Sequence, residues 1–417
     1  MNYKTLLTSS LIAFSCQAGA QHAATFAITG DNNGGAGDFV WMNIRKVDVG
    51  SGKLVSTVYD RLNPTSQLLD ADTKKAYTVT ASFKGNAYTT TEYPTSSYVA
   101  AAAYDKRHNK LFFTPMRKGE LRWVDLSDNN NPQFYTLSSK LINPLNLADE
   151  ANHITRMDIA ADGNGYAVTN DGNHLIRFTT GKKTVITDLG PLNDAETNKG
   201  ISIHNRCSSW GGDMVADAYG KLYIISATHS VFKVDIDGRT ATYMGVISGL
   251  PANYTTNGAA VDDDGKVVVS SANSYDGFYK FDIKDLAAVK MDGSDKYTAS
   301  DLANGNLLFQ KEADAKRSFG VTNELPLATI NADARIFPNP VTNNEFKVLF
   351  DNQAAGQYYV VVSDLSGRNV LSQLVQVSSK MQTVNVRINN TLGKGVYLVK
   401  VVDANKQLVF TDRVVIQ

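Results

Sequence analysis

Short stretches in which apolar and polar residues alternate recur along most of the chain. Two examples are Val-Phe-Lys-Val-Asp-Ile at residues 231–236 and Phe-Tyr-Lys-Phe-Asp-Ile at residues 278–283. A period of two is typical of a half-buried β-strand. Asn-Gly and Asp-Gly pairs between such stretches favour tight hairpins. The pattern therefore predicts an all-β chain built from short antiparallel strands.

These stretches belong to a repeat. Each copy has a small apolar strand, an aspartate that begins a turn, and a second apolar strand; the aligned aspartates are Asp105, Asp162, Asp217 and Asp262. They lie 57, 55 and 45 residues apart, and a third and a fourth strand complete each copy. This spacing is typical of β-propeller blades. Residues 21–325 are predicted to form a β-propeller of about six blades, or seven if some blades are short.

The pattern changes after Leu325. Residues 326–335 are predicted to be a linker, and residues 336–417 contain strands separated by Gly, Asn and Asp turns. That length suits a small Ig-like β-sandwich.

The first 20 residues have the three parts of a secretory signal peptide. Lys4 supplies the positive charge, residues 6–14 supply a short apolar segment, and Ala18-Gly19-Ala20 forms a cleavage site. No later segment is predicted to span a membrane. Cleavage leaves Cys207 as the single cysteine, so the mature protein must be stable without an internal disulfide.

The charge balance gives no reason to expect a polyanionic partner. Lys and Arg together number 41, and so do Asp and Glu. A chain without net charge has no electrostatic basis for binding nucleic acid or an anionic membrane.

Three motifs stand in order in the C-terminal segment. They are Pro338-Asn339-Pro340, Asp364-Leu365-Ser366-Gly367-Arg368, and the strand Lys394 to Val401 with its Gly395 and Tyr397. Prolines stiffen the entry to the segment, and Gly367 suits a hairpin turn. From residue types alone, the segment could equally be an ordinary Ig-like module that binds a ligand or holds the propeller away from the cell surface.

Together the three motifs resemble the C-terminal sorting domain (type A) of the type IX secretion system, over residues 336–417. The resemblance implies that the secretion machinery and its sortase are partners of this segment. Such domains direct a passenger across the outer membrane of Bacteroidota, where it is released or attached to the cell surface. The blade sequence, most clearly residues 162–178, also resembles NHL-type propellers, which implies architecture and not activity.

Aromatic residues are frequent in the loops between blades and between second and third strands, which gather on one face of a propeller. They are Tyr88, Tyr93, Tyr98, Trp210, Tyr254 and Tyr275. Rings beside Asn, Ser and Thr can stack on sugars or grip peptides, although loop tyrosines also pack over blade ends. The leading prediction is a secreted or surface-attached binding module for an extracellular glycan or polypeptide.

Two further features suggest alternatives. His204 and Cys207 lie in one loop segment, either as a nucleophile pair or as parts of a packed loop. Asp158 and Asp213 hold equivalent positions at the starts of inner strands, where the site of a hydrolase or lyase acting on extracellular polymers would form. A structural surface protein without a small ligand is the third interpretation.

No metal site and no cofactor are predicted. The acidic residues 262–264 repeat the position of the other turn aspartates, so turn chemistry explains them. The loop 31–38 either binds calcium or is flexible. The sequence contains no P-loop, no G-x-G-x-x-G, no G-x-S-x-G and no H-E-x-x-H motif.

Overall fold

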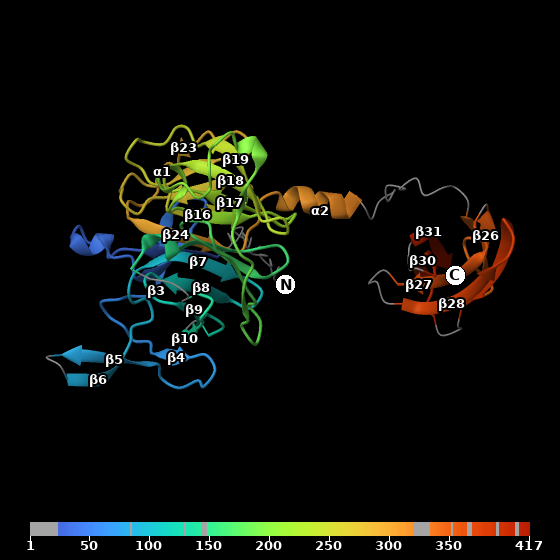
Figure 1. The fold of residues 1–417 in the computed structure, drawn as a ribbon, viewed down its shortest axis with the longest axis horizontal. Helices are drawn as coiled ribbons and strands as arrows, with labels where there is room; N and C mark the ends of the chain where they lie inside the picture. Colours follow the sequence, from blue (N-terminus) through green and yellow to red (C-terminus); the bar gives the residue numbers. More distant parts are fainter. Residues whose placement is uncertain are drawn as a thin grey trace, which may run out of the picture. The chain divides into compact units, whose positions relative to one another are not determined.

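The computed structural model describes residues 24–83, 86–128, 131–142, 148–319, 334–351, 353–364, 369–388, 392–404 and 408–417. The chain divides into two compact units, residues 1–317 and 318–417 (Figure 1). The predicted signal peptide lies outside the described residues, as do residues 326–333 of the predicted linker.

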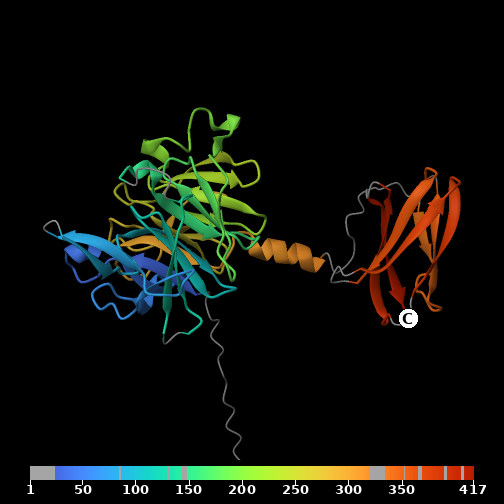
Figure 2. The same ribbon diagram turned by 60° about the horizontal axis from the view of Figure 1, so that its bottom comes forward.

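Five sheets form the blades of the first unit, and the strands of each blade are named from the innermost to the outermost (Figures 1 and 2). Blade 1 consists of β24 (Ala299–Asn304), β1 (Thr25–Thr29), β2 (Asn43–Asp48) and β3 (Lys53–Tyr59). Blade 2 consists of β7 (Val99–Asp105), β8 (Lys110–Pro115), β9 (Glu120–Asp125) and β10 (Gln133–Ser138). Blade 3 consists of β11 (Ile154–Ile159), β12 (Gly165–Thr169), β13 (Leu175–Phe178) and β14 (Ile186–Asp188).

The last two blades follow the same plan. Blade 4 consists of β16 (Asp213–Ala216), β17 (Lys221–Ile225), β18 (Ser230–Asp235) and β19 (Thr240–Val246), with β15 (Asn193–Asp194) beside β19. Blade 5 consists of β20 (Gly258–Val261), β21 (Val267–Ser270), β22 (Tyr279–Phe281) and β23 (Val289–Lys290). The inner strands β7, β11, β16, β20 and β24 pack in that order, and β24 packs against β7. The ring therefore closes, which confirms the predicted β-propeller.

The described residues form five blades, fewer than the six or seven expected from the length of the repeat region. The residues between blades 1 and 2 form no blade. Strand β4 (Leu68–Asp70) runs parallel to the outer strand β10, while β5 (Thr78–Phe83) and β6 (Asn86–Thr91) pair only in a separate hairpin.

Strands from both ends of the unit close the ring in blade 1. β1 pairs with β24 in antiparallel register, with Phe26 opposite Ala303, and both side chains are buried. Since no covalent bond joins the first and last strands, hydrogen bonds and burial alone hold the ring closed.

The repeated aspartates stabilise the turns between first and second strands. The Oδ1 atom of Asp217 accepts hydrogen bonds from the amides of Tyr219 (2.8 Å) and Lys221 (2.9 Å). Asp262 accepts from Asp264 (2.9 Å) and Lys266 (2.8 Å) in the same way. Turn chemistry therefore accounts for these residues.

Helical segments are short. They are η1 (Ala36–Phe39), η2 (Glu150–Asn152), η3 (Glu196–Asn198), α1 (Arg206–Ser209) and α2 (Gln310–Phe319). Helix α2 occupies residues that the sequence pattern assigned to the propeller. Within the described ranges, no helix has the length and apolar character needed to cross a membrane.

The second unit is a β-sandwich. One sheet contains β25 (Ala334–Phe337), β26 (Glu345–Asp351) and β29 (Met381–Arg387). The other contains, in order, β28 (Asn369–Val377), β27 (Gly356–Ser363), β30 (Gly395–Asp403) and β31 (Leu408–Ile416). Phe346, Phe350 and Val360 lie in the core between the sheets, which confirms the predicted sandwich. Strand β25 begins at Ala334, slightly before the predicted start at residue 336.

Candidate functional site

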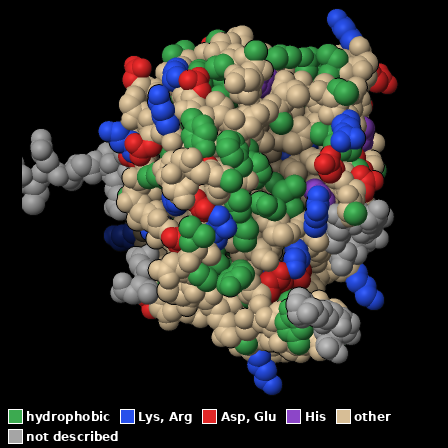
Figure 3. All heavy atoms as spheres, turned by 90° about the vertical axis from the view of Figure 1, so that its left-hand side faces the viewer, with side chains coloured by type: hydrophobic (Ala, Val, Ile, Leu, Met, Phe, Trp, Pro, Cys, Tyr) green, Lys and Arg blue, Asp and Glu red, His purple; other side chains and the backbone are tan. Residues whose placement is uncertain are grey.

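One face of the propeller carries η1 and α1, and we call it the loop face; it lies opposite the side from which α2 leaves (Figure 1). Figure 3 shows hydrophobic side chains gathered across the middle of this face, with charged side chains spread around them. The loops before each inner strand and the loops between second and third strands meet on this face.

Four aromatic residues from three blades form two ring pairs on the loop face, and we call the four residues the aromatic strip; Phe39 of one pair and Trp41 of the other are two residues apart in the chain. The rings of Tyr275 and Phe39 meet edge to face with centroids 5.8 Å apart. The rings of Trp41 and Tyr98 are 6.3 Å apart. Phe39 is 43% exposed, Tyr98 41% and Tyr275 38%. Three rings are therefore available to a ligand that crosses blades 5, 1 and 2.

Asp38 fixes the loop that carries Phe39. Its carboxylate accepts hydrogen bonds from the amides of Asn33 (2.8 Å) and Gly34 (2.9 Å) and from the hydroxyl of Tyr275 (2.8 Å). Burial opposes the ionised form, but these hydrogen bonds outweigh burial and lower the pKa of Asp38. The loop is thus held by an ionised carboxylate whose oxygens already have protein donors.

A second carboxylate in this loop is also engaged. Asp31 pairs with Arg61, whose Nε donates at 2.7 Å, and accepts from Asn43 Nδ2 at 3.0 Å. The expected choice for residues 31–38 was between calcium binding and a flexible loop. The contacts of Asp31 and Asp38 support neither alternative, because they hold the loop in place by hydrogen bonds within the protein.

A buried arginine positions the loop that carries Tyr93 and Tyr98. Arg122 is fully buried and lies between the carboxylates of Glu92 and Glu120, at 3.1 and 2.5 Å. Its Nη1 also donates to the carbonyl oxygen of Tyr93 at 3.0 Å. Tyr98 has a φ of 68°, which is unfavourable for a residue with a bulky side chain. Tyr93 is 58% exposed.

Other predicted aromatic residues have structural contacts. Tyr254 is only 1% exposed, and its hydroxyl lies within hydrogen-bond distance of two carbonyl oxygens, those of Val269 (3.0 Å) and Gly277 (2.9 Å). The expectation that Tyr254 contacts a ligand is therefore wrong. Trp210 is half-buried, and its Nε1 donates to the carbonyl of His204 at 3.2 Å. Tyr88 is exposed on the β5–β6 hairpin.

The arrangement of His204 does not support a nucleophile pair. Its Nδ1 and Nε2 atoms face the carbonyl oxygens of Asp171 (2.5 Å) and Leu192 (3.1 Å). Cys207 is exposed at the start of α1. Since both ring nitrogens of His204 contact backbone oxygens, neither is positioned to take a proton from the thiol. The packed-loop interpretation fits this segment.

Three inner strands carry a carboxyl group at the equivalent position. Asp158 accepts from the amide of Ala216 on the next blade at 2.7 Å, and Asp213 accepts from Ala259 at 2.7 Å. Asp301 on β24 is the third, and it was not predicted from the sequence. Asp158 and Asp213 therefore link neighbouring inner strands.

Burial dominates the electrostatics of this group. It raises the pKa of Asp158 to about 7. Burial also raises the pKa of Asp213, and burial together with the charge of Asp213 raises that of Asp301. Burial lowers the pKa of Arg156 on β11 to about 10. All four side chains are at most 7% exposed, so a polymer has no access to them.

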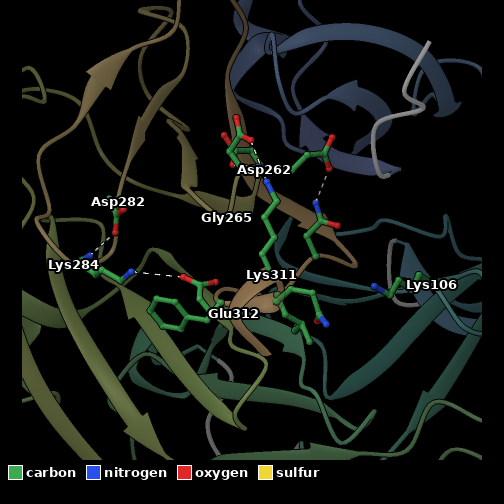
Figure 4. Close-up of a pocket in the computed structure, with 13 residues that line it drawn as sticks. Lys106, Asp262, Gly265, Asp282, Lys284, Lys311 and Glu312 are labelled. Atoms are coloured by element: carbon green, nitrogen blue, oxygen red, sulfur yellow. Dashed lines mark hydrogen bonds and ion pairs between the residues drawn. The ribbon is translucent and has the colours of Figure 1, made fainter. Parts of the chain in front are cut away.

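A hollow of about 200 Å³ lies on the other side of the propeller, beside α2 (Figure 4). Several of its charges are already paired. Lys311 lies 3.3 Å from Asp264, and Lys284 lies 3.7 Å from Glu312. Among the described residues, no group of three or more His, Cys, Asp or Glu side chains is arranged to hold a metal ion.

Comparison with protein families identifies the second unit. The family model named secretion system C-terminal sorting domain matches residues 335–417. This match confirms the resemblance to a type IX sorting domain, so the chain carries the signal of a protein exported to the cell surface or the medium. Gly367 and Arg368 of the second motif lie outside the described residues. No curated protein matches the chain.

Solved structures that resemble the chain are distant. PorZ, a surface component of the type IX secretion system of Porphyromonas gingivalis, is 13% identical over 90% of this chain, with a TM-score of 0.32. The match covers only 50% of PorZ. A Bacteroides caccae protein of unknown function is 10% identical, with 94% of each chain covered and a TM-score of 0.32.

A third distant match is an enzyme. Virginiamycin B lyase of Staphylococcus aureus is 12% identical over 82% of this chain and 88% of its own, with a TM-score of 0.29. Scores this low carry no argument, so the propeller assignment rests on the closed ring of five sheets. The resemblance of the blades to NHL propellers stays a prediction.

Proposed function

We propose that the propeller is a binding module for an extracellular polymer and that the aromatic strip is its binding site. The sorting domain delivers the propeller to the cell exterior, where soluble and surface polymers are its available ligands. The observation that carries the proposal is the two ring pairs of the strip, Tyr275 with Phe39 and Trp41 with Tyr98, which come from three blades.

The rigidity of the loops that carry these rings supports the strip as a binding site. Asp38 fixes the loop of Phe39 and holds the Tyr275 hydroxyl, while Arg122 fixes the loop before Tyr98. A ligand that lies on preorganised rings loses less free energy to the ordering of side chains. The unfavourable φ of Tyr98 is of the kind that accumulates at functional sites.

A glycan is the ligand that this surface favours, and a polypeptide is the second choice. Apolar faces of sugar rings stack on aromatic rings, and nearby polar groups bond their hydroxyls. Arg61, whose side chain is 23% exposed, is paired with the carboxylate of Asp31, which is 5% exposed. Because the two charges of this pair balance each other, the pair adds no net charge that would select a charged polymer.

A hydrolase or lyase is less well supported. It would need carboxyl groups that reach a substrate, and Asp158, Asp213 and Asp301 are buried, the first two with backbone contacts across the blades. A structural surface protein without a ligand would leave the exposed and ordered rings unexplained.

Affinity electrophoresis with the purified chain, lacking its signal sequence, tests the proposal. The gels contain a neutral β-glucan, a mannan, soluble chitin oligosaccharides or gelatin. We expect retardation by at least one glycan and a loss of affinity of about tenfold or more in the double variant Phe39→Ala, Tyr98→Ala. Tyr219→Ala is the matched control, because Tyr219 is 47% exposed in a turn on the opposite side.

Each other result has a definite meaning. Retardation by gelatin alone makes the ligand a polypeptide. Binding that is equal in the double variant and the parent protein shows that the strip is not the site.

A further inference from the structure

Polar side-chain atoms of the first and third sorting motifs are used within the sandwich. Asn339 donates from Nδ2 to the carbonyl of Arg413 (2.7 Å) and accepts at Oδ1 from the amide of Val415 (2.9 Å). Its side chain thus acts as a strand partner along the outer edge of β31. The hydroxyl of Tyr397 donates to the carbonyl of Gly393 at 2.8 Å. These side chains serve the fold of the domain, so a docking surface has to be sought elsewhere on it.

The third motif has a second half that the core does not use. Along β30, Tyr397, Val399 and Val401 point into the core. The residues that alternate with them, Val396 and Leu398, point outwards and do not belong to the core. Apolar side chains on a solvent-facing surface contribute little to the stability of this domain.

These residues continue into an apolar band across the four-stranded sheet. Tyr359 on β27 stands opposite Leu374 on β28 and opposite Val402 on β30. Leu374 is 52% exposed, Tyr359 39% and Val396 37%. Val361, Leu398 and Val415 lie diagonally or directly beside them and are partly exposed. Directly opposite side chains are about 5 Å apart and diagonal ones about 7–8 Å, so these residues form one patch, in which Lys400 stands opposite Val361.

The charges on this face have one sign. Lys400 and Arg413 alternate onto it with the apolar residues. Asp403 is paired with Tyr358, and Asp412 with Val399. Because Tyr358 and Val399 face the core, the two aspartates lie on the opposite side of the sheet from Lys400 and Arg413. Among the described residues, the outward face of this sheet carries apolar and basic side chains, with neutral polar ones such as Gln357, Gln376 and Ser372 at its margin, and no acidic side chain.

The other sheet of the sandwich provides a contrast. Its exposed apolar residues each stand opposite a polar one, Leu349 opposite Thr383 and Met381 opposite Asp351. Arg387 and Glu345 form an ion pair on the same face at 2.9 Å. That face has the mixed character of an ordinary protein surface.

We infer that the band of Leu374, Tyr359, Val402, Val361, Leu398 and Val396 is the surface by which the sorting domain docks on the export machinery. The partner surface that fits it is apolar and carries carboxylates, which pair with Lys400 and Arg413. A contiguous exposed apolar patch with a polar border marks an interaction site. In a domain whose function is sorting, the machinery that sorts it is the partner that such a site serves.

The test is an export assay with the full chain in a host that has a type IX system. Leu374→Thr combined with Leu398→Thr removes the centre of the band and introduces β-branched residues suited to strands. We expect the exported fraction to fall about tenfold, with the variant retained in the periplasm. The matched control is Leu349→Thr combined with Met381→Thr on the other sheet, which should be exported like the parent chain.

Two further measurements exclude trivial causes. The thermal midpoint of the purified variants shows whether the sandwich is folded. A second pair, Lys400→Glu and Arg413→Glu, changes only the charge of the border and should also reduce export. Normal export of both folded variants overturns the inference, and so does an equal loss in the control. Light scattering that finds a dimer of the parent chain but not of the Leu374→Thr, Leu398→Thr variant also overturns it, because the band would then bind a second copy of this chain.

Discussion

The three carboxyl groups of the inner strands predict an unusual dependence of stability on pH. An unfolded aspartate ionises near pH 4, whereas burial raises the folded pKa of Asp158 to about 7. The folded protein therefore binds more protons than the unfolded chain between these values. By linkage, the contribution of this group to the free energy of unfolding is highest below pH 4 and falls as the pH rises through 7.

The size of the effect follows from the two pKa values. Between pH 5 and pH 8, Asp158 alone should lower the free energy of unfolding by about 3 kcal/mol. Asp213 and Asp301, whose pKa values are raised too, act in the same direction. Carboxylates with lowered pKa values, such as Asp38 and Glu120, lose their contribution only as the pH falls below about 4. The propeller should therefore be most stable near pH 5.

Denaturant unfolding of the chain at pH 5, 6, 7 and 8 measures this directly. The variant Asp158→Asn removes one titrating group, so its free energy of unfolding should change less across the series, by about 3 kcal/mol. Asp264→Asn, at an exposed position, should leave the slope unchanged. Stability that is constant or rises from pH 5 to pH 8 would refute the reasoning, because these carboxyl groups would then be ionised in the folded protein at no cost.

Three further substitutions test the contacts around the sites. Arg122→Ala leaves the buried Glu120 without its cation and Glu92 with Lys118 alone, and it should destabilise the propeller by about 3–5 kcal/mol in urea unfolding. Tyr254→Phe removes a hydroxyl that contacts two buried carbonyl oxygens and should cost about 1–3 kcal/mol without altering ligand affinity; a loss of affinity at unchanged stability would restore Tyr254 as a binding residue. Asn339→Ala removes both hydrogen bonds to β31 and should lower the thermal midpoint of the sandwich measurably; an unchanged midpoint contradicts its structural role.

The propeller architecture could be predicted from the sequence because each blade repeats the same order of strands and turns. Asp162, Asp217 and Asp262 mark turns that the structure places at the same end of three successive blades. The number of blades could not be predicted correctly. The residues between blades 1 and 2 have strand-like sequence, but β4 joins the outer edge of blade 2, and β5 and β6 form a separate hairpin. Pairing partners are set by tertiary contacts that local alternation does not encode.

The candidate site shows the same limit. Tyr98 and Tyr275 were expected on the loop face and are exposed there, whereas Tyr254 turns inwards because its hydroxyl reaches two carbonyl oxygens. Phe39 and Trp41 were missed because the loop before β2 lies in the least regular copy of the repeat. Asp301 was missed for a related reason: where the aspartate of the turn is expected, the chain has Gly305.

The central claim is that the sandwich is the export signal and the propeller is the domain that is exported. It is tested most directly by expressing the full chain and a chain that ends at Leu325 in a host with a type IX system, followed by cell fractionation and mass spectrometry of the mature termini. We predict that the full chain reaches the surface or the medium without its last segment and that the shortened chain stays in the periplasm. Equal export of both chains would contradict this claim, and the sandwich would then have to be considered a binding module.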